Sequence, residues 1–86
     1  MGYPDYDTSE SVTPAFKAED RGTGTDAVDK TRGIHCNVGD TYELTFNDGG
    51  VIDMVLVTGL MYPYCVTNVL TTGSAAIDAG DITLLY

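Results

Sequence analysis

The chain has 86 residues, which predicts a single domain. Its 13 acidic against 4 basic side chains give a formal net charge of -9. This excess argues against binding to nucleic-acid phosphates or to anionic membranes. No apolar run is long enough to cross a bilayer, and the first residues lack the charged-then-apolar pattern of a signal peptide.

The first part of the chain, residues 1–32, differs in composition from the rest. It is rich in Asp, Glu, Ser, Thr, Gly and Pro and shows no apolar periodicity, so it cannot build a core of its own. We therefore divide the chain into an extended N-terminal arm over 1–32 and a folded body over 33–86. We expect the arm either to be disordered or to gain order on a surface that it crosses.

The basic residues of the chain all lie in this arm: Lys17, Arg21, Lys30 and Arg32. From 33 to 86 there is no Lys or Arg. Two explanations fit this distribution. The charges keep the chain in solution and oppose edge-to-edge aggregation, or the basic segment lies against an acidic body, its own or that of a neighbour.

Apolar residues in the body alternate with polar ones or form short β-branched runs, as is typical of strands. The predicted strands are 33–38, 41–47, 51–57, 64–70 and 81–86. Gly-containing turns separate them, and the order predicts a meander. The fold class is therefore all-β, a small antiparallel β-sandwich or barrel with an extended N-terminal arm.

The turn between the strands at 41–47 and 51–57 can be placed by matching apolar side chains across the hairpin. A two-residue loop would put the apolar sets of the two strands on opposite faces, whereas a three-residue loop over 48–50 puts them on one face. The predicted pairs are Phe46 with Ile52, Leu44 with Met54, and Tyr42 with Leu56. The other face then exposes Val55 and Val57, as a candidate interface or as a surface partly covered by another strand.

The chain contains few residues with catalytic or ligating chemistry. Cys36 and Cys65 are too few for a disulfide framework, so we expect two buried free thiols. His35 and Cys36 are neighbours in a strand and point to opposite faces, so they cannot act as a nucleophile and base. No spacing matches a zinc, calcium or phosphate-binding motif. We predict no enzyme, no metal and no cofactor.

Several short motifs of the sequence resemble a family of virion proteins. They are Thr31-Arg32-Gly33-Ile34, Val38-Gly39-Asp40, the Asp48-Gly49 turn, Tyr62-Pro63, the small-residue loop at 71–76 and Leu84-Leu85-Tyr86. In this order they are similar to the spike base proteins of gene transfer agents and related tailed phages. The resemblance covers about residues 26–86.

The resemblance implies a virion structural protein on the outside of a tailed-phage-like head, assembled in the host cytoplasm. It would act as a capsid decoration (cement) protein or as a head-spike base. Its implied partners are the major capsid protein and further copies of the chain in a trimer or pentamer, with a spike fibre protein as a further candidate.

Candidate interface residues come from the sparse anchors and basic side chains of the arm and from the tyrosines beside Pro63, because tyrosine suits interfaces. They are Tyr3, Tyr6, Phe16, Lys17, Arg21, Lys30, Arg32, Tyr62 and Tyr64. The alternative is a small ligand-binding β-sandwich, for example a carbohydrate-binding module that uses Tyr62 and Tyr64.

Overall fold

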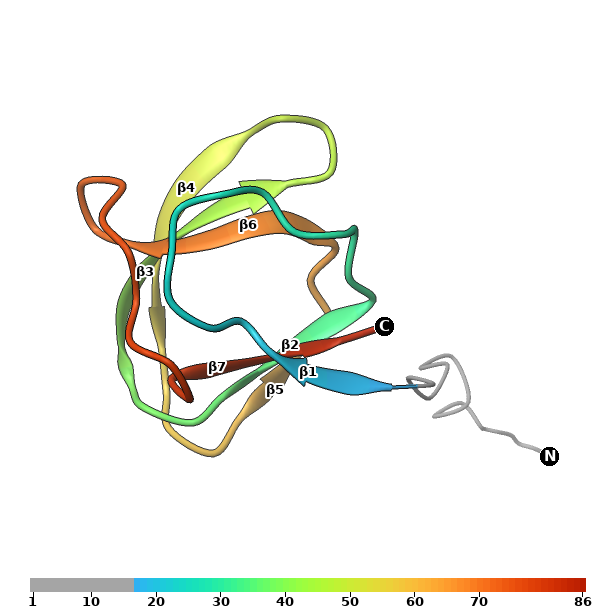
Figure 1. Ribbon diagram of the computed structural model, residues 1–86, viewed down its shortest axis with the longest axis vertical. Helices are drawn as coiled ribbons and strands as arrows, with labels where there is room; N and C mark the ends of the chain where they lie inside the picture. The colour runs from blue at the N-terminus through green and yellow to red at the C-terminus, as the bar shows by residue number, and fades with distance from the viewer. Residues whose placement is uncertain (1–16) are drawn as a thin grey trace, which may run out of the picture.

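The computed structural model describes residues 17–86, which form two antiparallel sheets and contain no helix (Figure 1). The strands are β1 (Ala18–Asp20), β2 (Gly33–Cys36), β3 (Asp40–Phe46), β4 (Val51–Leu56), β5 (Met61–Tyr62), β6 (Val66–Thr71) and β7 (Ile82–Leu85). One sheet has the order β1-β7-β2-β5 and the other the order β4-β3-β6. The predicted all-β sandwich is confirmed, but the predicted meander is wrong, because β6 pairs with β3 rather than with β4. In this part of the chain there is also no helix that could span a membrane.

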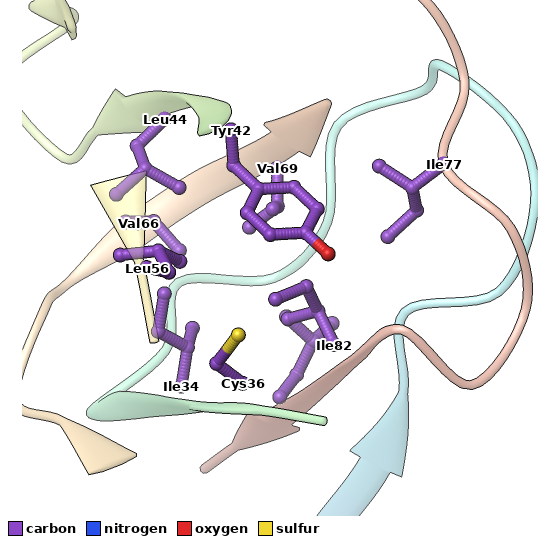
Figure 2. Close-up of a cluster of buried hydrophobic side chains, with 10 residues drawn as sticks. Ile34, Cys36, Tyr42, Leu44, Leu56, Val66, Val69, Ile77 and Ile82 are labelled. Carbon is purple, nitrogen blue, oxygen red and sulfur yellow. The ribbon is translucent and has the colours of Figure 1, made fainter. Parts of the chain in front are cut away.

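The core lies between the two sheets and is made mostly by strand side chains, joined by Ile77 from the segment between β6 and β7 (Figure 2). Its fully buried members are Ile34, Cys36, Tyr42, Leu44, Leu56, Val66, Val69, Ile77, Ile82 and Leu84. Each large aliphatic side chain buried in this way contributes about 1.5–3 kcal/mol. The cluster is therefore the main source of stability for a domain of this size.

Tyr42 brings a polar group into this core. Its hydroxyl donates a hydrogen bond to the Val38 carbonyl, as a buried phenol requires. Burial raises the pKa of Tyr42 to about 12, and the negative charge of Asp81 adds to the effect. The fold therefore holds this side chain in its neutral form.

The β3–β4 hairpin has the predicted kind of loop in a different place. The Phe46 N–H donates to the Gly50 carbonyl over 2.8 Å, and the Gly49 N–H donates to the Phe46 carbonyl over 2.8 Å. The loop is therefore residues 47–49, with Gly49 in the left-handed region at φ 92°. Only glycine adopts this conformation at little cost.

The predicted register of this hairpin is consequently wrong by two residues. Leu44 pairs with Ile52 and Tyr42 pairs with Met54. A shift of two residues leaves every side chain on the same face of the sheet, so the prediction that the two apolar sets share a face is correct. Matching apolar faces could not tell these two registers apart.

Residues 17–32 belong to the body rather than to an arm. β1 pairs antiparallel with β7, with Glu19 opposite Leu84. The chain then runs along the outer edge of β6, where the Val28 N–H donates to the Thr67 carbonyl over 2.8 Å. The expectation that this stretch gains order only on another molecule is wrong, because its own sandwich offers strand edges that it can pair with.

A candidate protein-binding edge

The outer edge of β4 is open. β4 pairs only with β3, and the Phe46–Gly50 hydrogen bond fixes which of its backbone groups face β3. By that alternation the N–H and C=O groups of Val51, Asp53 and Val55 point away from the sheet. They have no hydrogen-bond partner among residues 17–86. The open edge ends at Val57, whose N–H donates to the Tyr62 hydroxyl over 2.9 Å.

Exposed apolar side chains surround this edge. With the exception of Val38, the large apolar side chains that are about half exposed or more within 17–86 all lie between 51 and 61. They are Val51, Ile52, Val55, Val57, Leu60 and Met61, and Val55 is the most exposed at 72%. Single exposed apolar residues are ordinary, but Val51 and Val55 share the outer face of one strand, and exposed apolar side chains grouped on one face are typical of interaction sites.

The sandwich is also open at one end of β4. Ile52 points toward the inside by its register with buried Leu44, yet it is 53% exposed. A hollow of about 520 Å³ lies beside it, and its lining is Phe46, Asn47, Asp48, Gly50, Ile52, Pro63, Tyr64 and Cys65. The facing edge strand, β5, has only two residues, which is too short to cover this end.

Aromatic rings form one wall of the hollow. Tyr64 meets Phe46 edge to face, with ring centroids 5.6 Å apart, and stacks on Tyr62 with centroids 5.4 Å apart. Offset and edge-to-face pairs of this kind stabilise their own geometry. The wall is therefore preformed and needs no ligand to hold it.

The other edge of the same sheet, along β6, is closed by the chain itself. The Arg21 side chain is buried, and its Nε donates to the Val69 carbonyl over 3.1 Å. Its Nη2 donates to the Asp26 carbonyl and to the Asn68 Oδ1, both over 2.9 Å. The Thr31 N–H donates to the Val66 carbonyl over 3.1 Å. This edge offers little to a partner.

The basic residues predicted as interface contacts have different surroundings. Lys17 is exposed and lies 5.0 Å from the ring centroid of Tyr86. Arg21 is held inside the fold, so it does not present its charge to a partner in this conformation. Lys30 is exposed, and Arg32 is exposed while its N–H donates to the Leu85 carbonyl. The aromatic residues predicted in the arm, Tyr3, Tyr6 and Phe16, lie outside the described residues.

The structure stacks Tyr62 on Tyr64, which lines the hollow, and both side chains are half-buried. The sequence pattern predicted these tyrosines and the exposed Val55 and Val57 as interface candidates. It did not predict the exposure of Ile52, which alternation places on the same face as the core residues. A possible signal is the short apolar stretch at β5, because a strand of two residues is too short to cover Ile52.

The residues considered as catalytic or metal-binding candidates form no common site. Cys36 and Cys65 are free thiols, the first buried and the second half-buried. Burial raises the pKa of the Cys36 thiol. His35 lies on the opposite face of β2, with its Nδ1 2.7 Å from the Asn37 Oδ1. Within the described stretch, no group of three or more His, Cys, Asp or Glu could hold a metal ion.

In comparisons with known proteins, no family model, no curated protein and no solved structure matches this chain. The similarity to spike base proteins therefore remains a prediction from the residues. The open edge of β4 is the structural feature that favours a protein-binding function.

Proposed function

We propose that this chain is a structural assembly protein that binds another protein along the open edge of β4. One observation carries the proposal: unpaired backbone groups of β4 lie between exposed valine side chains. Soluble proteins normally protect such an edge with charges, proline or a covering segment. Here a single charge, that of Asp53, stands on the open stretch, and added strands are a common mode of protein recognition.

The proposed setting is the outside of a tailed-phage-like head, where the protein acts as capsid decoration or as a head-spike base. The major capsid protein is the proposed partner, and the chain works as a trimer or pentamer with a spike fibre as a further candidate partner. Support comes from the sequence resemblance, from the small β-sandwich and from the apolar edge of β4. The role is mechanical, because each copy would bury apolar area across a joint between capsid subunits.

A carbohydrate-type ligand-binding module is the second candidate. The hollow favours it, because the rings of Phe46 and Tyr64 lie beside the polar Asn47 and Asp48. Such a mixture of apolar wall and few polar groups is typical of small-molecule sites. This candidate would use the hollow and leave the valines of β4 without a role.

Occupancy on purified particles tests the first candidate. Heads would be produced with the wild-type chain, with Val55→Asp or with Ala27→Asp, and the bound chain would be quantified by mass spectrometry. Ala27 is exposed and adjoins Val28, which is bonded to β6 at the opposite edge of the sheet. It therefore controls for the added charge. We expect equal occupancy for the wild type and Ala27→Asp, and a loss of about tenfold or more for Val55→Asp.

Two outcomes would contradict the assembly role. One is a wild-type chain that is absent from the particles, and the other is full occupancy by Val55→Asp. A glycan array separates the second candidate, since binding to defined glycans that is lost in Tyr64→Ala and kept in Val55→Asp would favour the ligand-binding module.

A further inference from the structure

We infer that the open edge of β4 takes an extended segment of a different protein, with a Lys or Arg side chain opposite Asp53 and apolar side chains on both sides of it. The inference rests on the proposed function in taking this edge as the binding surface. It adds the chemistry of the partner.

The positions of side chains on an added strand follow from the edge itself. Val51, Asp53 and Val55 point their backbone groups outward, and their side chains share the outer face of the sheet. In a paired strand, the residues directly opposite carry their side chains on the same face, about 4.5–5.5 Å away. One partner residue therefore faces Asp53, and apolar residues two positions before and after it face the exposed valines.

Charge selects a cation for the central position. Asp53 is exposed, and its partner on β3 is Glu43, so two like charges lie side by side on this face. The Glu43 carboxylate is bound by the Ser74 N–H and hydroxyl on the β6 side, over 3.0 and 2.8 Å. No ion pair to Asp53 is formed within the described stretch, and opposite charges across a strand pair are favourable.

A second copy of the chain is a poor occupant of this edge. Antiparallel pairing of two β4 edges about a twofold axis through Asp53 would place that carboxylate against its own copy, and like charges directly opposite are destabilising. Each copy also carries a net charge of -9, which adds repulsion. The proposed trimer or pentamer would therefore use other surfaces.

The first residues of the chain are equally unsuited to this edge. Positions 1–16 contain Asp5, Asp7 and Glu10 and have no Lys or Arg. They therefore carry no basic side chain that could pair with Asp53. A basic segment of another protein meets this requirement better.

The inner face adds a second requirement. Residues directly before and after the cation would point inward, beside Ile52, which is half exposed at the mouth of the hollow. An apolar side chain there would cover Ile52 and approach the Phe46 and Tyr64 rings. The predicted partner sequence is five residues long: two apolar, one Lys or Arg, and two apolar.

A peptide titration tests this inference. The probes are Thr-Val-Ile-Lys-Ile-Val-Thr and the same peptide with Glu at the centre, added to the isotope-labelled full chain at physiological salt. Binding is followed by NMR at the amides of Val51, Asp53 and Val55. We expect shifts at these amides and a preference of about fivefold for the Lys peptide.

Two variants separate the local charge from the overall charge. Asp53→Lys should reverse the preference toward the Glu peptide. Asp26→Lys makes the same charge change at an exposed side chain near β6, and it should keep the preference for Lys. Reversal in both variants would show only general attraction to an acidic protein and would overturn the inference.

The remaining outcomes are also decisive. Equal binding of both peptides at the β4 amides would overturn the cationic partner and leave the edge as a binding surface. A lack of shifts at these amides with either peptide would overturn the inference too, and particle occupancy of Val55→Asp would then decide the proposed function separately. Dimerisation through β4 in sedimentation experiments would replace the foreign segment with a second copy.

Discussion

The edge strands of the three-stranded sheet, β4 and β6, each pair with β3 and each have six residues. Their outer edges nevertheless differ. Figure 1 shows the segment that connects β1 to β2, which runs along β6. This segment supplies backbone hydrogen bonds to β6, and Arg21 at its start is buried and donates to the Val69 carbonyl. Along β4, the outward backbone groups have no partner within residues 17–86, and the apolar side chains of Val51, Ile52 and Val55 are exposed. Within residues 17–86, the chain therefore covers the β6 edge of this sheet and leaves the β4 edge uncovered.

The open edge is the surface where a partner is expected. An open apolar edge risks aggregation, and natural proteins usually protect it. β4 has the more exposed apolar surface of the two strands and only one charge to protect it, that of Asp53. A surface that is costly to leave open in solution is best explained by a partner that covers it.

The largest effect is expected when the closed edge loses Arg21. Arg21→Ala removes hydrogen bonds to the Val69 carbonyl and to Asn68, and a buried carbonyl without a donor is costly. We expect the free energy of unfolding to fall by about 3 kcal/mol in urea titrations. Lys30→Ala changes the charge equally at an exposed side chain and should cost less than about 0.5 kcal/mol. Equal losses would mean that Arg21 does not hold this edge.

Alkaline pH should lower the stability of the fold through Tyr42, which lies on β3 between the two edge strands. The pKa of Tyr42 is raised from about 10 to about 12, first by burial. The unfolded chain would lose this proton near pH 10 and the folded chain only near pH 12. Stability is therefore intact below pH 10 and falls as pH rises to 12, by about 2–3 kcal/mol.

Urea titrations between pH 9 and pH 12 measure this loss. Tyr42→Phe has no hydroxyl to ionise and should show a smaller decline over the same range. A decline of the same size in the variant would assign the effect to other groups.

A pair of substitutions compares a core side chain of β6 with an outer-face side chain of β4. Val69 on β6 is fully buried and Val55 on β4 is 72% exposed. Val69→Thr buries a hydroxyl and should cost about 2 kcal/mol, whereas Val55→Thr should change stability by less than about 0.5 kcal/mol. Thermal melts of the two variants, each as the free chain, measure the two losses of stability. Similar losses would show that β4 is covered in solution.

The smallest effect concerns the start of the covering segment. The Asp20 carboxylate accepts hydrogen bonds from the Gly22 and Gly80 N–H groups, over 3.0 and 2.9 Å, and these bonds lower the pKa of Asp20. The stabilisation is present above the usual Asp pKa and is lost as pH falls through the lower, folded value. Melting temperatures of the wild type and Asp20→Asn should therefore differ at pH 7 and converge in acid. A constant difference would contradict this role.

Much of the fold could be predicted from the sequence, because alternation along β2, β3 and β7 marks the buried face without help from distant residues. β1 could not be predicted, since its three residues Ala-Glu-Asp show no apolar pattern and are ordered by pairing with β7. The hairpin register failed for a different reason, because a shift of two residues leaves the faces unchanged.

The candidate site could be predicted only in part. Val55 and Val57 were visible as apolar positions on a polar face, and Tyr62 and Tyr64 as a cluster beside a turn. The burial of Arg21 could not be predicted, since it depends on the Val69 carbonyl and the Asn68 amide, which are 48 and 47 positions away. Whether a strand lies at an edge is a property of the sheet order, which the sequence does not display.

Amide hydrogen exchange in the dilute, isolated chain tests most directly whether one edge is open and the other closed. The outward amides of β6 have acceptors at Thr31, Asn68 and Ala75. We predict slow exchange at Val66, Val69 and Thr71, and fast exchange at Val51, Asp53 and Val55. Slow exchange at all six amides would contradict the account, because it would mean that β4 is already covered when no partner is present.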